Sequence, residues 1–438
     1  MQKLVLLELN EVNFDYINRY IAKGRLPAFA KLIENYGVAK TESESAYAEL
    51  EPWIQWVTAH TGLSLSEHGL FRLGDIHNSD VRQIWEHLEK EFGCKVGAIS
   101  PMNAANRTQM SPFFVPDPWT GGEISGPRSV ERLYDSISLL VNDNASGRAG
   151  LIDMIRIGVA VFRYGGQVSW RRYINGIAGS ITGKWRRAIV LDLLLTDLFL
   201  ASWEKSKPEF SSLFLNGGAH IQHHYLFNSS VYEGNEENPN WYVPANKDPV
   251  LEIYELYDKI LSTILSLPDV RLMVATGLHQ DPHDKVTYYY RLREHKEFLS
   301  KVGVEDFEVF PRMSRDFLLR FASVDSAEQA ANILESAESE SGERVFSVDN
   351  RGGELFCMLI YPNIIDEKFS LLIKGEPFDN FFSEVSFVAI KNGQHNGVGY
   401  FVDTGDAERL ASVSFPLAEV FDRIVRVFED PKVVQETQ

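Results

Sequence analysis

The sequence lacks cysteine pairs and long apolar runs. Cys94 and Cys357 are the only two cysteines, one in each half of the chain, and they do not resemble a secreted disulfide framework. No uncharged run is long enough to span a bilayer. The apolar start is short and interrupted by Glu8 and Asn10, and it has no small-residue cleavage site of a signal peptide. These absences predict a cytoplasmic protein.

Basic residues are also scarce. The chain has 61 acidic against 43 basic residues, a formal net charge of −18. Such a charge repels nucleic acid, and no nucleic-acid-binding motif is evident, so we expect no nucleic-acid partner. In 438 residues, 44% are hydrophobic and 24% charged, which is the balance of a globular chain with a sizeable core. Only the last residues, 431–438, read as a disordered tail.

The order of apolar segments predicts an α/β fold with a doubly wound central sheet flanked by helices. Residues 3–9 form a continuous apolar run, typical of a strand buried on both faces. Helical patterns follow, including one over 79–92 that Ser79 caps, and then a strand over 95–100. The alternation resumes in 209–295 and 376–438, where strands are expected at 211–216, 271–276, 385–390 and 399–405. The core is therefore expected in 1–128, 209–295 and 376–438.

Two segments interrupt this alternation. Residues 129–208 are mostly helical without a clear strand, which predicts a helical lid inserted into the core. Residues 296–375 give the order strand, helix, strand, strand and predict a small α+β subdomain.

Several segments, in order, resemble the alkaline phosphatase superfamily, in particular its type I phosphodiesterase and nucleotide pyrophosphatase branch. The first strand with its acidic turn and two helices is similar to that branch, as is the TG-x-x-x-x-x-HG segment from Thr61 to Gly69. NGGAHIQHHY (216–225) and HNGVG (395–399) resemble the two late histidine segments. The resemblance implies an alkaline-phosphatase-like fold, and a site where two metal ions, usually zinc, flank a nucleophilic Ser or Thr.

The positions that carry this chemistry differ here. The resemblance places the family's first aspartate on Asn10, with Glu11 next to it, and the nucleophile near residues 50–52. No Ser or Thr occurs between Ala46 and Val57, and Glu49 and Glu51 stand there instead. Glu51 is thus predicted to be a general base or a metal ligand. The alternative is that both acids belong to a solvated strand end.

The histidine segments retain part of a metal site. The family's Asp and His four residues apart fall on Asn216 and His220, and its last metal histidine falls on His395. The Asp-His-Gly segment falls on residues 277–279, where both ligands are lost unless His279 or Asp281 shifts inward. Amides in place of carboxylates reduce the negative charge that holds two cations. The resemblance therefore implies one divalent metal, zinc or manganese, and not a conventional two-zinc site.

The candidate residues fall into three groups by predicted role. The catalytic candidates are Glu51, Glu11 and His220, and the metal-binding candidates are His220, His395 and Asn216. The substrate-binding candidates are Asn10, Asn216, His223, His224, Arg171 and Arg172. For His223 and His224 the alternative role is to cap a helix.

The helical insertion carries a net positive charge, opposite in sign to the charge of the whole chain. Between Arg148 and Arg187 it has eight basic residues against one acid, Asp153, interleaved with apolar residues that include Trp170 and Trp185. This pattern suits an anionic partner, such as a membrane surface, a lipid-linked acceptor or a nucleotide-sugar. The alternative is a lid whose basic face pairs with the acidic core. The first interpretation places the protein at the inner face of the membrane as a peripheral protein.

The sequence favours an enzyme that acts on a small phosphate-containing or sugar-phosphate substrate. Without a hydroxyl nucleophile, direct attack by water or by an acceptor hydroxyl is expected, so both hydrolysis and group transfer are open. Transfer includes glycosyl transfer in surface-polysaccharide assembly. The rival hypothesis is a non-catalytic scaffold, derived from a phosphodiesterase, that binds an anionic ligand in the former substrate pocket.

Overall fold

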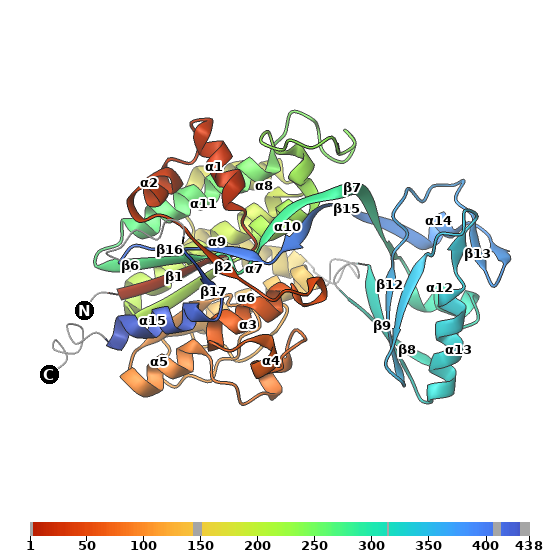
Figure 1. Cartoon of the computed structure of the whole chain (residues 1–438), viewed down its shortest axis with the longest axis horizontal. Coiled ribbons are helices and arrows are strands. Elements are labelled where there is room, and N and C mark those ends of the chain that lie inside the picture. The colour runs from red at the N-terminus through yellow and green to blue at the C-terminus, as the bar shows by residue number, and fades with distance from the viewer. Residues whose placement is uncertain (1–2, 143–150, 313–314, 406–412, 430–438) are drawn as a thin grey trace. The chain divides into compact units, whose positions relative to one another are not determined.

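The computed structural model describes residues 3–142, 151–312, 315–405 and 413–429 (Figure 1). Arg148 and the expected tail over 431–438 lie outside this part of the chain. The chain divides into two compact units, one made of residues 1–139, 149–282 and 393–438 and the other of 140–148 and 283–392. The predicted subdomain 296–375 falls within the second unit, which extends further in both directions. No helix among the described residues is long and apolar enough to cross a membrane.

The first unit is built on an eight-stranded sheet in the order β17-β2-β16-β6-β1-β5-β3-β4. The central strand β1 (Lys3–Leu9) pairs in parallel with β5 (Phe210–Leu215) and β6 (Val270–Ala275). The other strands of this sheet are β2 (Ala39–Glu42), β3 (Val96–Ile99), β4 (Phe113–Val115), β16 (Val398–Asp403) and β17 (Ser414–Pro416). Only β16 runs antiparallel to its neighbours, β2 and β6.

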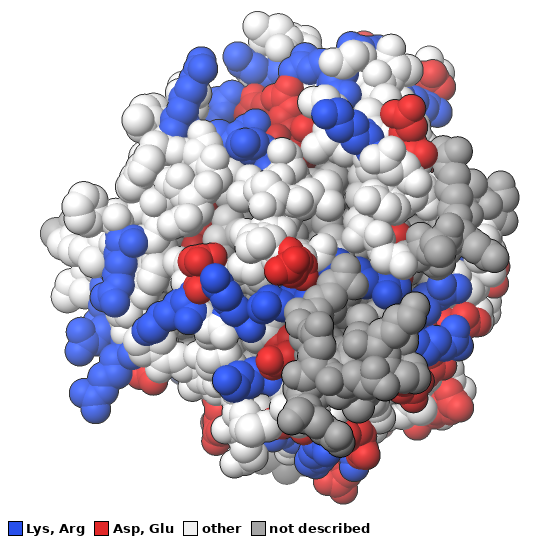
Figure 2. Space-filling view, turned by 90° about the vertical axis from the view of Figure 1, so that its left-hand side faces the viewer, with Lys and Arg blue, Asp and Glu red and all other residues white. Residues whose placement is uncertain are grey.

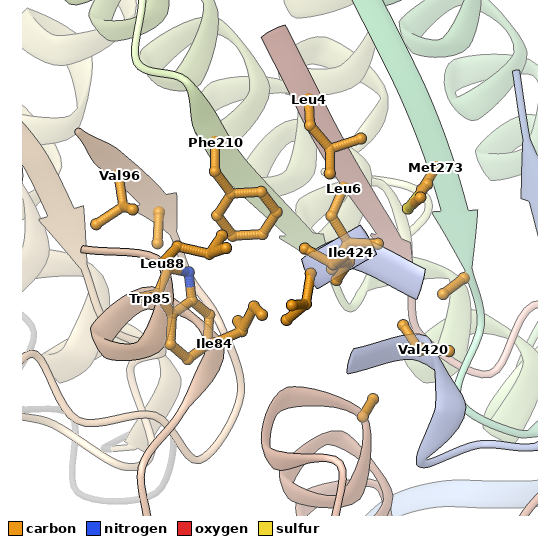
Figure 3. Packing of buried hydrophobic residues seen from close by; sticks show 14 of the residues in the cluster. Leu4, Leu6, Ile84, Trp85, Leu88, Val96, Phe210, Met273, Val420 and Ile424 are labelled. Atoms are coloured by element: carbon orange, nitrogen blue, oxygen red, sulfur yellow. The ribbon is translucent and has the colours of Figure 1, made fainter. Parts of the chain in front are cut away.

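Helices cover both faces of this sheet. On one face, α5 (Ile84–Phe92) and α15 (Glu419–Glu429) pack on the strands through Leu88 and Ile424, which join Leu4, Leu6 and Phe210 in one buried cluster (Figure 3). On the other, α9 (Arg186–Ser206) contacts β3 and β5, and α11 (Pro249–Leu265) contacts β6. The predicted α/β fold with a doubly wound central sheet is confirmed.

Further helices lie wholly or mostly in this unit. They are α1 (Phe14–Ala22), α2 (Pro27–Tyr36), α3 (Pro52–Thr61), α4 (Leu65–His68), α6 (Arg128–Asn142), α7 (Leu151–Tyr164), α8 (Trp170–Gly179) and α10 (Gly217–Tyr225).

Two sequence expectations about elements were wrong. Helix α5 begins at Ile84 and not after Ser79, because Gln83 and Glu86 form a capping box at its start. The strand expected in the core at 385–390 lies in β15 (Val385–Asn396), which pairs with β7 (His279–Leu292) in a separate two-stranded sheet. Much of β15 is half-buried, which distinguishes it from the fully buried strand β1.

The second unit has its own core. A four-stranded antiparallel sheet in the order β11-β12-β9-β8 is made of β8 (Phe307–Pro311), β9 (Asp316–Phe321), β11 (Phe346–Asn350) and β12 (Glu354–Leu359). Helix α13 (Val324–Glu335) packs on this sheet, and α12 (His295–Lys301) contacts β8. A three-stranded sheet of β10 (Glu338–Ser339), β13 (Leu371–Ile373) and β14 (Glu376–Phe378) and the short helix α14 (Phe381–Glu384) complete it.

Candidate metal centre

Polar residues gather where the parallel strands β1 and β5 end. Asn10 and Glu11 follow β1, and Asn216 follows β5 as the first residue before α10. The Asn10 side-chain amide donates to Asn216 Oδ1 at 2.7 Å and to Glu11 Oε1 at 3.1 Å, while Trp56 Nε1 donates to Asn10 Oδ1 at 2.7 Å. Asn10 is buried, so its hydrogen bonds join the two strand ends and orient Glu11.

Glu11 adopts a backbone conformation that non-glycine residues seldom take. Its φ is 58°, in the left-handed region. The surrounding structure fixes this conformation, because the Glu11 amide donates to Thr276 O at 3.0 Å and Gln222 Nε2 donates to Glu11 O at 2.8 Å. Such strain costs about 1–3 kcal/mol and is concentrated at functional sites. The strained backbone therefore marks Glu11 as a positioned side chain.

Two imidazoles converge on the Glu11 carboxylate. Glu11 Oε2 lies 3.1 Å from His223 Nε2 on α10 and 3.3 Å from His395 Nε2 on β15, and the two nitrogens are 3.3 Å apart. Glu11 is buried, whereas His223 and His395 are partly exposed. The carboxylate oxygen and both nitrogens therefore point to one spot that solvent can reach.

This geometry fits a single metal ion. Ligand atoms bound at about 2.0–2.1 Å around tetrahedral zinc are about 3.3–3.4 Å from one another. The three separations of 3.1, 3.3 and 3.3 Å are close to this value. Two imidazoles and a carboxylate are also the donor set of a catalytic zinc site with an open fourth position. Glu11, His223 and His395 thus form a cluster that could hold a metal ion.

A second layer of residues holds the Glu11 carboxylate in place. Gln280 Nε2 donates to Glu11 Oε2 and, at 3.1 Å, to Ala219 O, while Asn10 donates to the other carboxylate oxygen. Such outer hydrogen bonds orient metal ligands and tune their basicity. The sequence analysis missed Gln280, because a glutamine at the start of a strand gives no distinct signal.

The charges favour an ionised Glu11. Burial alone would raise the pKa of its carboxyl, but the two imidazoles, His395 and then His223, hold the pKa well below its usual range. Glu11 therefore remains a carboxylate at neutral pH, the form that binds a cation.

Glu51 stands beside this cluster at the start of α3. It occupies the N-cap position, yet its side chain makes no capping hydrogen bond. Burial raises the pKa of Glu51 to about 7; the nearby His395 opposes this shift and Glu11 adds to it. Tyr47 lies near the same groups: burial raises the pKa of its phenol, and the charges of Glu51 and Glu11 add to that shift. A carboxyl that titrates near neutrality is suited to accept a proton.

The three histidines of α10 occupy different positions. His223 belongs to the cluster with Glu11, whereas His220, the ligand expected from family spacing, is outside it. The His220 side chain is exposed, and its ring lies 5.1 Å from that of His224. The predicted metal and catalytic roles of His220 and the substrate role of His224 stay predictions.

Other candidate residues are engaged elsewhere. His279 Nε2 lies 3.2 Å from Asp281 Oδ1, and Asn396 donates to Asp281 Oδ2 at 2.7 Å, so these residues form a separate network. Arg172 donates to the backbone oxygen of Glu255 on α11 at 3.0 Å, and Arg171 is exposed on α8. The proposed contact of both arginines with substrate stays a prediction.

Close packing at the start of α10 sets the position of His223. Gly217 N donates to Asp192 Oδ2 at 2.9 Å, and Gly218 N donates to Tyr257 Oη at 2.7 Å. A Cβ on Gly217 would lie 2.6 Å from Asp192 Oδ2, closer than any relaxed contact. Helix α10 can therefore approach α9 this closely only with glycine here.

We expect Gly217→Ala to destabilise the protein by about 1–3 kcal/mol, because the added methyl group overpacks this contact. The measurement is the free energy of unfolding in urea. Gly158→Ala is the control, since a Cβ on that helical glycine meets nothing within 4 Å and should not destabilise. Equal stability of the two variants would contradict the packing argument.

Comparison with known proteins adds a similarity of fold. No protein-family model and no curated protein matches the sequence. Among solved structures, phosphonoacetate hydrolase from Sinorhizobium meliloti in complex with phosphonoformate is 9% identical, with a TM-score of 0.45 over 98% of this chain and 96% of that one. Human ectonucleotide pyrophosphatase/phosphodiesterase 5 is 10% identical, with a TM-score of 0.45 over 98% and 95%.

A third match is TAB5 alkaline phosphatase, a mutant with magnesium bound, at 10% identity and a TM-score of 0.40 over 98% of this chain and 97% of that one. All three are alkaline phosphatase superfamily proteins, the group that the sequence motifs resemble. At such low identity the likeness concerns the chain path, and no residue role is carried over from it.

Proposed function

We propose that this chain is an enzyme that acts on a phosphate ester through one divalent metal ion. The observation that supports it is the convergence of Glu11, His223 and His395 within 4.8 Å, next to Glu51. Zinc suits this donor set best, and manganese is the alternative. A cation held by these atoms would polarise a phosphoryl oxygen as a Lewis acid.

Other residues of the chain would transfer the proton and position the Glu11 carboxylate. Glu51, at the N-terminus of α3 and with its raised pKa, takes the proton from the attacking hydroxyl group. The partial positive charge at that helix end also favours an anionic substrate. Asn10 and Gln280 keep the Glu11 carboxylate oriented. Because a carboxylate stands where relatives have a hydroxyl nucleophile, the attacking group is water or an acceptor hydroxyl, without a phosphorylated enzyme intermediate.

We propose nucleotide-sugars and related sugar phosphates as the substrate class. In hydrolysis water would bond to phosphorus and the ester oxygen would leave; in the alternative, glycosyl transfer in polysaccharide assembly, an acceptor hydroxyl would bond to the sugar carbon and the nucleotide would leave with its phosphate. Two similar solved structures are complexes with small phosphorus-containing ligands, phosphonoformate in phosphonoacetate hydrolase and AMP in murine ectonucleotide pyrophosphatase/phosphodiesterase 5. A lipid-linked acceptor fits the basic helical insertion.

The test is to incubate zinc-loaded, manganese-loaded and chelator-treated protein with a set of nucleotide-sugars in ¹⁸O-labelled water, and to analyse the products by mass spectrometry. Metal-dependent consumption is expected, and Glu11→Gln should lower it more than about 100-fold, since even outer-layer changes at metal sites cost 10–100-fold. Label in the products indicates hydrolysis, and unlabelled products joined to an added acceptor indicate transfer.

Two outcomes would contradict the proposal. Absence of turnover together with absence of bound metal would favour the scaffold hypothesis. Rapid zinc-dependent turnover of generic phosphodiesters would show that the ordinary two-metal chemistry persists.

A further inference from the structure

Helices α7 and α8 expose apolar side chains in regular stripes. On α7, Ile152, Ile155, Val159 and Phe162 have the spacing i, i+3, i+7, i+10 and are 55–84% exposed. This spacing places them along one side of a helix. The opposite side of α7 is buried through Asp153, Ala160 and Val161. The apolar stripe is thus the outer face of the helix and not its packing face.

The same arrangement occurs on α8. Trp170, Ile174 and Ile177 have the spacing i, i+4, i+7, and Ile181 extends the series just after the helix, with exposures of 48–86%. Tyr173 and Gly176 form the buried side. Both helices pack against α9.

This concentration of exposed apolar residues is unusual for the molecule. Of the twenty large apolar side chains that are exposed in the described part of the chain, nine fall between residues 152 and 181. Scattered exposed apolar residues are normal, but exposed apolar stripes along a helix are typical of a surface that binds a partner. The exposed apolar residues of 152–181 are therefore candidates for a partner-binding surface.

The charges around the stripes identify the kind of occupant. Between residues 151 and 191 the only acid is Asp153, which is buried. The exposed charged residues of this stretch are all basic, namely Arg156, Arg163, Arg171, Lys184 and Arg187. Figure 2 shows one face of the molecule, where Lys and Arg side chains and also Asp and Glu side chains lie among uncharged residues.

The inner basic residues behave differently. Arg186 forms an ion pair with Glu252 at 2.7 Å, and Arg172 donates to Glu255 O, both on α11. These two contacts join the helical insertion to the core, as the lid interpretation expected. Arg156 pairs with Asp153 at 3.4 Å, so Arg163, Arg171, Lys184 and Arg187 are the outer basic residues that would attract an anionic partner.

We propose that α7 and α8 form an interfacial surface that binds a bilayer containing anionic phospholipids. The apolar stripes would enter the boundary between headgroups and acyl chains, while the flanking arginines and lysine stay at the level of the lipid phosphates. Each basic residue near such a surface adds attraction that falls off within a Debye length. The inference goes beyond the proposed function, since the surface uses none of the cluster around Glu11.

The test is cosedimentation of the full chain with vesicles of phosphatidylcholine containing 30% phosphatidylglycerol, compared with pure phosphatidylcholine. Binding is expected to the anionic vesicles, and it should weaken as sodium chloride rises from 0.1 to 0.5 M. Ile177→Ser should weaken binding about tenfold, since an exposed isoleucine that enters the apolar layer gains roughly the transfer free energy of its side chain.

A matched control is available in the second unit. Ile364 is 54% exposed and Ile177 is 53% exposed, so Ile364→Ser removes the same side chain at equal exposure and should leave binding unchanged. Glu11→Gln should also bind vesicles normally, which separates this inference from the catalytic proposal. Absence of binding at low salt, or equal weakening by both serine variants, would overturn the inference. A dimer in solution that Ile177→Ser converts to monomer would overturn it as well, by assigning the face to a second copy.

Discussion

His223→Ala should lose the bound metal, while His220→Ala should keep it. Protein purified without chelator is expected to contain about one zinc or manganese ion per chain if Glu11, His223 and His395 supply the ligands. Removing one of three protein ligands should weaken metal affinity by more than about 100-fold, because even outer-layer changes cost 10–100-fold. Elemental analysis of the two variants and the parent protein measures this directly.

The pair of variants is matched. Both histidines lie on α10, three residues apart. Alanine favours helix formation, so both substitutions should preserve the helix. His223 Nε2 is 3.1 Å from Glu11 Oε2, whereas His220 lies outside the cluster with its ring against His224. Loss of metal in His220→Ala with retention in His223→Ala would favour the ligand set expected from family spacing over the observed geometry.

The sequence could predict the fold because the fold depends on local patterns. The continuous apolar run of β1 and the alternation of strands with helices define a doubly wound sheet, and they are visible without coordinates. The position of β15 could not be predicted in this way. An apolar segment of suitable length resembles a core strand whether it joins the central sheet or pairs with β7 outside it.

Part of the site could be predicted from the sequence. Glu11 and His395 were candidates from the sequence, and the structure brings their side chains to within 3.3 Å. Sequence spacing could not decide whether His220 or His223 is the metal ligand, because residues at i and i+3 lie close together on a helix. It depends on the direction of α10, which Asp192 and Tyr257 fix from distant parts of the chain. Gln280 acts only through Glu11, so its role appears only in three dimensions.

Glu51→Gln should abolish most of the activity. It should also remove the loss of stability that the parent protein undergoes as the pH rises. The general base must be deprotonated, so the rate of the parent enzyme should rise with pH through the pKa of Glu51, which is about 7 without metal and which a bound cation lowers. Loss of general-base catalysis typically lowers kcat by about 10²–10⁴-fold. The residual activity of the glutamine variant should no longer show this rise. Glu49→Gln, a change of the neighbouring acid, is the control and should keep the pH profile.

The stability change follows from the same shift, with a definite sign. The pKa of Glu51 is raised from 4.5 to about 7 on folding, so between these pH values the unfolded chain loses its proton while the folded chain keeps it. The unfolded state then binds fewer protons, and the stability falls as pH rises through this window and stays constant above it. In metal-free protein at pH 8, Glu51→Gln should therefore be more stable than the parent by on the order of 1–3 kcal/mol, with little difference at pH 4. Urea unfolding at the two pH values measures this difference. A variant that is equally stable at both and retains the pH-dependent rise in rate would show that Glu51 is a solvated acid, the alternative that the sequence left open.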